Sequence, residues 1–293
     1  MDINEARLDS KDITHYAVEY DHELKILWGL FVDKKSASFT RPLMAEIIEH
    51  DRELAVDAQG VICAGSDRPV DFYVWASRMP GFFSLGGDLA LFVDLIKKGN
   101  RAELMHYATQ CIDIMFSRLS NYHSPRLVTV SLVQGAALGG GFEAALASDI
   151  IIAEEQAKFG LPEIGFNLFP GMGAYSILSR RIGPDLAKQM IVSGDIYSAR
   201  ACLERGVIDV VVPEGEGVNA LAEYIKKTQK RKNGLTAFYN ARRAISPVTY
   251  QELMVVTTHW VEAALKLEDQ DLRLMMKLVR SQQRKLEQIR TSV

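Results

Sequence analysis

Two short runs of almost uninterrupted apolar residues constrain the fold more than any other feature of the sequence. They are VDFYVWAS at residues 70–77 and RLVTVSLV at residues 126–133, and each precedes a glycine-containing turn and a stretch of helical spacing. A strand that is apolar on both faces must be covered on both faces, and strands that alternate with helices are typical of a parallel sheet between helices. The sequence therefore predicts an α/β fold with a mostly parallel sheet.

The residues before these strands predict two further elements. Residues 14–32 are rich in β-branched and aromatic side chains that alternate with polar ones, and Asp21-His22 is a suitable turn, so we expect a hairpin. The segment TRPLMAEIIEHDRELAVDA then changes to helical spacing, with Thr40 able to cap the helix and Pro42 in its first turn.

The last expected strand, GVIDVVVP, ends at Pro213, and the rest of the chain is helical in character. Residues 218–289 carry apolar side chains at helical spacing, and that apolar surface must be buried somewhere. We therefore expect an α/β core with its N-terminal hairpin over residues 1–213 and a helical region over residues 214–293. The helical region can cover the core or pack against another subunit, so an oligomer is expected.

Charge and composition exclude several classes of function. The formal net charge is -3, which gives no general attraction for nucleic acid, and the apolar runs are too short and interrupted to span a bilayer. The first residues are polar and lack the pattern of a secretory signal, so a cytoplasmic location is expected. The three cysteines are widely spaced and the histidines form no zinc motif, so neither a metal nor a cofactor is expected.

Two glycine turns predict a site for negative charge. In SLVQGAALGGGFEAAL a buried strand leads through Gly139, Gly140 and Gly141 into a helix that begins near Phe142, and in FFSLGGDLALF a similar glycine turn precedes Asp88. The first N–H groups of a helix have no acceptor within it, and glycine leaves room for a ligand oxygen beside them. Two such turns that supply one N–H each would form an oxyanion hole for a thioester carbonyl, although glycine turns also serve close packing.

Two carboxylates stand in unusually apolar surroundings. Glu143 follows the three glycines among alanine, leucine and phenylalanine residues, and Glu163 follows Pro162 before another apolar, glycine-rich segment. Burial in such surroundings raises the pKa of a carboxyl group and suits it to proton transfer. Loss of water from a 3-hydroxyacyl thioester requires one base for the α-proton and one acid for the departing hydroxyl, and this pair could supply both.

Four ordered motifs resemble the crotonase superfamily, which contains the enoyl-CoA hydratases and isomerases. The motifs are FFSLGGDLALF, VQGAALGGGFEAALASDIIIA, AKFGLPEIGFNLFPGMGA and IVSGDIYSARACLERGVIDVVVP, and the resemblance covers residues 37–213. Within the superfamily the sequence is most similar to the diffusible signal factor synthases of the RpfF type, through LGGDLALF, GGGFEAAL and NLFPGMGAYS.

The resemblance implies a spiral of β-β-α units followed by helices that take part in trimer formation. It implies that the N–H groups of Gly87 and Gly140 form the oxyanion hole, that Glu163 faces the α-carbon and that Glu143 faces the hydroxyl or water. It further implies a medium-chain 3-hydroxyacyl substrate on acyl carrier protein, dehydration to a cis-2-enoyl thioester, and hydrolysis to a free fatty acid signal for quorum sensing. Synthases of this family are also restrained by a partner sensor kinase.

One departure from ordinary hydratases concerns the turn after the second carboxylate. Hydratases continue there with Gly-Gly-Thr, whereas this chain has Gly173-Ala174-Tyr175, which argues against a β-oxidation hydratase. The apolar residues around both turns are candidates for an acyl-chain pocket, with core packing as the alternative. The candidate substrate-binding residues are Leu85, Gly86, Phe166, Leu168, Phe169, Met172 and Tyr175.

Two questions stay open at the level of sequence. The densest basic segment, IKKTQKRKNG with Lys230 and Arg231 at its centre and Arg242 and Arg243 beyond it, could meet an acidic carrier protein or could be a solvated helix end. The function could also be that of a conventional enoyl-CoA hydratase or isomerase acting on acyl-CoA, or of a non-catalytic protein that binds an acyl ligand. The presence of both Glu143 and Glu163 argues against the non-catalytic alternative.

Overall fold

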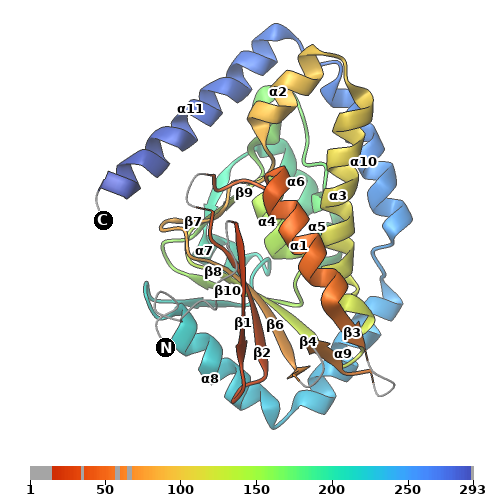
Figure 1. Cartoon of the computed structure of the whole chain (residues 1–293), viewed down its shortest axis with the longest axis vertical. Helices are drawn as coiled ribbons and strands as arrows, with labels where there is room; N and C mark the ends of the chain where they lie inside the picture. The colour runs from red at the N-terminus through yellow and green to blue at the C-terminus, as the bar shows by residue number, and fades with distance from the viewer. Residues whose placement is uncertain (1–14, 34–35, 57–59, 65–67, 292–293) are drawn as a thin grey trace.

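A six-stranded sheet forms one layer of the computed structural model, which describes residues 15–33, 36–56, 60–64 and 68–291 (Figure 1). The first two strands pair antiparallel and all later neighbours pair parallel. The predicted hairpin and mostly parallel sheet are therefore confirmed, although Thr14 lies outside the described residues. In spatial order the strands are β1 (Tyr16–Asp21), β2 (Ile26–Phe31), β6 (Phe72–Ser77), β8 (Val128–Val133), β10 (Ile150–Glu154) and β13 (Val210–Val212).

A second, four-stranded sheet contains three short strands that each follow a strand of the first sheet. After β6 comes β7, after β8 comes β9, and after β10 comes β11, and each short strand leads into a helical segment. This repeated β-β-α unit is the one expected from the resemblance, and the fold class is confirmed. The sheet contains β7 (Phe82–Ser84), β9 (Ala136–Leu138), β11 (Lys158–Gly160) and the antiparallel edge strand β12 (Ile196–Ser198).

The start of helix α1 is set by a capping residue and a proline. Thr40 caps α1 by accepting a hydrogen bond from the Leu43 N–H, with Pro42 in the first turn as predicted.

The remaining elements before residue 213 are a small sheet and a set of helices. They are β3 (Leu54–Val56), β4 (Ile62–Ala64), β5 (Pro69–Val70), α1 (Arg41–Glu53), α2 (Leu89–Lys97), α3 (Arg101–Leu119), η1 (Asn121–His123), α4 (Gly140–Leu146), η2 (Pro162–Phe166), α5 (Ala174–Ile182), α6 (Pro184–Ser193) and α7 (Ala199–Glu204).

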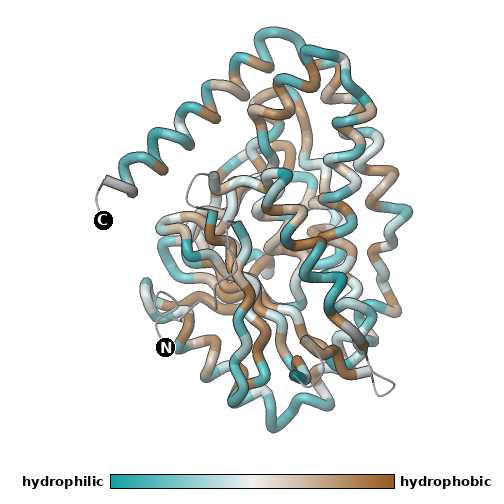
Figure 2. The backbone as a smooth tube through the Cα atoms, viewed as in Figure 1, coloured by the Kyte–Doolittle hydropathy of each residue, from teal (hydrophilic) through white to brown (hydrophobic). Residues whose placement is uncertain are grey.

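The C-terminal helices pack back on the α/β core. Helix α8 contacts β8 and β10, α10 lies along α3, and α11 contacts both α2 and η2. Hydrophilic and hydrophobic residues alternate along α11 in Figure 2, as expected for a helix with one buried face. Among the described residues no helix is both long and apolar enough to cross a membrane. These helices are α8 (Gly217–Gln229), α9 (Lys232–Ile245), α10 (Tyr250–Ala264) and α11 (Asp269–Thr291).

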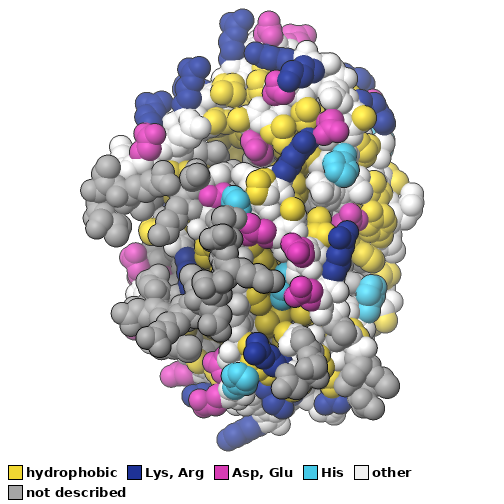
Figure 3. Space-filling model, viewed as in Figure 1, with side chains coloured by type: hydrophobic (Ala, Val, Ile, Leu, Met, Phe, Trp, Pro, Cys, Tyr) yellow, Lys and Arg dark blue, Asp and Glu magenta, His cyan; other side chains and the backbone are white. Residues whose placement is uncertain are grey.

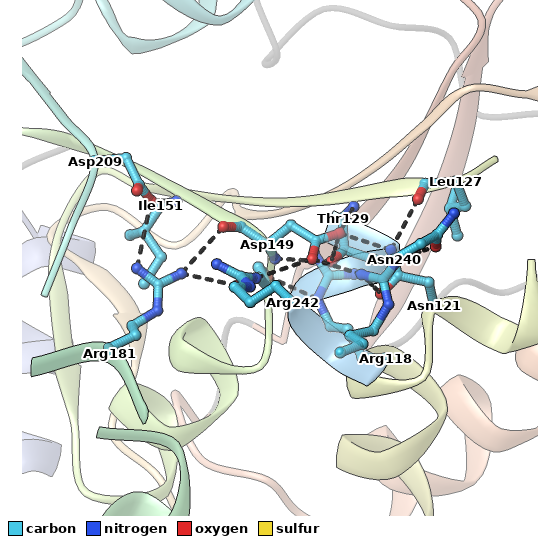
Figure 4. Close-up of polar contacts among 12 residues, drawn as sticks. Arg118, Asn121, Leu127, Thr129, Asp149, Ile151, Arg181, Asp209, Asn240 and Arg242 are labelled. Atoms are coloured by element: carbon cyan, nitrogen blue, oxygen red, sulfur yellow. Dashed lines mark hydrogen bonds and ion pairs between the residues drawn. The ribbon is translucent and has the colours of Figure 1, made fainter. Parts of the chain in front are cut away.

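A buried carboxylate ties α9 to the large sheet. Asp149, at the start of β10, accepts hydrogen bonds from Asn121 Nδ2 (2.6 Å), Arg243 Nη1 (2.8 Å) and Arg242 Nη2 (3.1 Å) (Figure 4). Thr129 adds its backbone N–H at 3.2 Å. Both arginines lie beyond the basic segment that could meet a carrier protein, and their side chains are already paired within the fold.

Candidate active site

Three glycine-rich or acidic turns meet at one edge of the second sheet. Strands β7, β9 and β11 are parallel neighbours, so their carboxyl ends lie at the same edge. The turn after β7 contains Gly86 and Gly87, the turn after β9 contains Gly139 and Gly140, and the segment after β11 contains Glu163. The topology therefore gathers residues that are up to 77 positions apart, counted from Gly86 to Glu163.

The two glycine turns are in direct contact. A Cβ added to Gly86 would lie 2.6 Å from the Gly140 nitrogen and 2.9 Å from the Leu138 oxygen, and Gly86 also has a left-handed φ of +84°. Only glycine fits there without displacing the other turn. The N–H groups of Gly87 and Gly140 have no acceptor among the described residues, and both glycines line the same cavity. An oxyanion hole needs free N–H groups of this kind beside the substrate.

The buried side chain of Tyr107 holds the Gly87 turn in place through two hydrogen bonds. The Tyr107 hydroxyl, on α3, donates to the Phe39 carbonyl oxygen (2.5 Å) and accepts from the Asp88 N–H (3.1 Å). The Asp88 side chain caps α2 by accepting from the Leu91 N–H at 3.0 Å. Sequence reasoning missed Tyr107, because nothing in the pattern of α3 indicates a contact with a turn that lies 19 residues away.

Glu143 is fully buried and hydrogen-bonded. It lies on α4, its side chain is 1% exposed, and its Oε1 accepts from the Met172 N–H (2.8 Å) and the Ala174 N–H (2.9 Å). Burial raises the pKa of Glu143 to about 7, and the two N–H groups limit that rise because they favour the ionised form. Glu143 therefore also holds the turn that precedes α5.

Glu163 is also buried, but its carboxyl group has fewer hydrogen-bond partners than that of Glu143. It lies on η2, its side chain is 9% exposed, and its Oε2 has no hydrogen-bond partner among the described residues. A Cβ on Gly139, whose φ is +53°, would lie 2.6 Å from Glu163 Oε1, so that glycine leaves room for the carboxyl group. Burial, and then the nearby charge of Glu143, raise the pKa of Glu163 to about 8.

The charge of Glu143 raises the pKa of Glu163, so the titrations of the two carboxyl groups are coupled. Hydrogen bonds favour the ionised form at Glu143, whereas Glu163 has an unpartnered oxygen and the higher pKa. These contacts favour a proton on Glu163 over one on Glu143 in the free site. This resting order differs from the roles implied by the resemblance, in which Glu163 takes the α-proton.

The two carboxyl groups line a mainly apolar cavity. Of the predicted substrate-binding residues, Leu85, Phe166, Leu168 and Met172 line it, together with Gly87, Gly140, Glu143 and Glu163.

Gly86, Phe169 and Tyr175 are not among the cavity-lining residues. Gly86 supports the wall through its contact with Gly140 instead, and Phe169 packs against the core. Tyr175 is 49% exposed, because α5 begins at Ala174 and directs its second residue away from the cavity. Its expected place in the pocket is not what the structure shows.

The C-terminal helices contribute much of the wall, which sequence reasoning did not anticipate. Trp260 comes from α10, and Met275, Leu278 and Gln282 come from α11. Helix α3 closes another side with Cys111. No group of three or more histidine, cysteine or acidic side chains suited to a metal ion occurs in the described ranges. The further lining residues are Leu89, Phe92, Tyr107, Ala108, Leu138, Gly139, Pro162 and Gly171.

Residues 63–252 match the family model described as enoyl-CoA hydratase/isomerase. One curated relative is the probable mitochondrial enoyl-CoA hydratase 2 of Arabidopsis thaliana, which is 32% identical over 169 residues. These make up 58% of this chain and 53% of the relative. The chain spans about half the length of the curated relatives that it matches.

Solved structures share the fold over almost the whole chain. An enoyl-CoA hydratase from Bacillus halodurans matches with a TM-score of 0.69 and 20% identity, covering 90% of this chain and all of that one. The DspI protein of Pseudomonas aeruginosa matches with a TM-score of 0.60 and 25% identity, covering 87% of this chain and 95% of that one.

Proposed function

The chain belongs to the enoyl-CoA hydratase/isomerase family, and from that premise we propose that it dehydrates a medium-chain 3-hydroxyacyl thioester and then hydrolyses the product. The proposed product is a free cis-2-unsaturated fatty acid that serves as a diffusible signal. The observation that carries the proposal is the pair of buried carboxyl groups beside two free glycine N–H groups at one end of an apolar cavity.

The chemistry follows from the charges of the site. The Gly87 and Gly140 N–H groups hold the thioester oxygen, so that negative charge develops there when the α-proton leaves. Glu143, ionised in the free site, takes the α-proton, and Glu163 gives its proton to the departing hydroxyl, which leaves as water. In the second step a water molecule attacks the thioester carbonyl in the same oxyanion hole, and the carrier thiol leaves with a proton.

Two features favour a lipid-like acyl group as the substrate. The first is that the cavity wall is formed mainly by apolar side chains. The second is that helices α10 and α11 add Trp260, Met275 and Leu278 to this wall. A chain held there would extend away from the carboxyl pair. The alternative is a conventional enoyl-CoA hydratase, which the names of the matched relatives favour and which would use the same pair without releasing an acid.

The proposed function is tested by mass spectrometry of the products formed from 3-hydroxydodecanoyl acyl carrier protein. We expect the free cis-2-enoic acid and the liberated carrier. A trans-2-enoyl thioester without free acid would support the hydratase alternative and overturn the synthase proposal. The absence of any turnover on either the carrier or CoA thioester would leave only ligand binding.

Dehydration should depend on pH with a bell-shaped profile. The reaction needs one ionised and one protonated carboxyl group, and the two pKa values lie at about 7 and about 8. Below about pH 7 both groups are protonated and the base is lost, whereas above about pH 8 both are ionised and the acid is lost. We expect the largest kcat/KM between these values, measured by product formation from pH 5.5 to 9.5. A flat profile over that range would contradict the proton-sharing pair.

A further inference from the structure

The outer face of α11 carries an uncompensated basic stripe. Residues 272–286 contain five lysine and arginine residues and no acidic residue. Four of the five recur at intervals of four, three and four residues, which places them on one face of the helix, and all four are exposed. In Figure 3 dark blue side chains follow the upper left edge, where Figure 1 places α11. The stripe consists of Arg273, Lys277, Arg280 and Arg284.

None of the four stripe residues forms an ion pair with any described residue. The basic side chains of α8 and α9 differ from the stripe, because several of them already form ion pairs within the fold. Lys232 pairs with Asp71, and Arg242 and Arg243 pair with Asp149. Four unpaired cations in a row raise the local potential and attract an acidic surface.

The stripe lies close to the candidate active site. The opposite face of α11 lines the cavity through Met275, Leu278 and Gln282. A surface groove next to the cavity is lined by Lys277 and shares Pro162 and Leu278 with it. By contrast, Figure 1 shows α8 and α9 at the other end of the molecule from α2 and α11.

We propose that the basic stripe of α11 docks the acidic surface of the acyl carrier protein that delivers the substrate. The inference rests on the proposed function, because only a carrier-bound substrate presents a protein surface to the enzyme. Charge complementarity of this kind steers association and fixes orientation. With the carrier on the stripe, the arm that bears the thioester enters the groove at Lys277 and reaches the cavity.

The test compares two substrates that carry the same acyl group. One is 3-hydroxydodecanoyl acyl carrier protein and the other is 3-hydroxydodecanoyl pantetheine, which has no protein surface. We expect the double variant Arg280→Glu/Arg284→Glu to lower the ratio of the two kcat/KM values by roughly tenfold or more. Raised salt should lower wild-type kcat/KM on the carrier substrate and should affect the variant less. Lys277 is left unchanged because it lines the groove.

The double variant Lys230→Glu/Arg231→Glu is the matched control, since it makes the same charge change on the distant basic segment. An unchanged ratio in the α11 variant, or a larger fall in the control, would overturn the proposed docking surface. Fluorescence anisotropy of labelled carrier protein measures binding without turnover. If wild type makes no free acid yet binds the carrier through α11, the proposed function fails and the docking surface stands.

Discussion

Glu143→Gln and Glu163→Gln should each reduce dehydration of the 3-hydroxyacyl substrate by roughly two to four orders of magnitude, the range typical of a lost general acid or base. Glutamine keeps the size of the side chain but cannot take or give the proton. In Glu143→Gln one acceptor oxygen can still receive the Met172 and Ala174 N–H groups, so the turn before α5 should survive. Single-turnover product formation is the measurement, with circular dichroism to verify folding.

Exchange of the α-proton with solvent deuterium separates the two roles. If the resting proton order governs the reaction, Glu163→Gln keeps its base and should still exchange the α-proton, whereas Glu143→Gln should not. Exchange that persists only in Glu143→Gln would return the α-proton to Glu163, the order that the resemblance implies. Normal dehydration in either variant would remove that residue from the mechanism.

Gly86→Ala should reduce turnover by about two to three orders of magnitude, as expected when an oxyanion-hole donor is lost. The added Cβ would lie 2.6 Å from the Gly140 nitrogen, which belongs to the backbone and cannot move independently. The two glycine turns must then separate, and their N–H groups no longer converge on one oxygen. The left-handed φ adds a cost of roughly 1–2 kcal/mol in stability. The measurements are kcat and the melting temperature.

Gly99→Ala is the matched control for Gly86→Ala. Gly99 also has a left-handed φ, +59°, but nothing lies within 4 Å of an added Cβ. It should therefore lose only the roughly 1–2 kcal/mol of stability that the left-handed φ costs, and it should keep almost full activity. Equal activities in the two variants would mean that contact between the glycine turns does not shape the site.

The core of the site could be predicted from sequence because it is encoded in local segments. Gly87, Gly140, Glu143 and Glu163 each stand in a short motif that follows a buried strand, and strand order alone brings those motifs to one edge. The apolar company of the two glutamates already indicated their burial. Local patterns also predicted the cap at Thr40.

The other features of the site could not be predicted, because they depend on packing between segments that are far apart in the sequence. Tyr107 contacts Phe39, 68 residues away, and nothing in either segment signals the other. Trp260 lies on an amphipathic helix whose apolar face could equally have met another subunit. Tyr175 lies outside the cavity lining because apolar spacing alone does not tell which residues of a helix face a cavity. Charge density alone also pointed to Lys230 and Arg231, and only three-dimensional position distinguishes them from the α11 stripe.

The ion pairs of Asp149 have a consequence for how the chain folds while it is being synthesised. Synthesis proceeds from the N-terminus, so β8 and β10 emerge well before α9, and the chain must grow by 93 residues beyond Asp149 before Arg242 exists. Until then the carboxylate lacks its cations, and a buried charge without its partner is strongly unfavourable. We therefore expect the sheet to be destabilised at this position in a chain that stops short of α9.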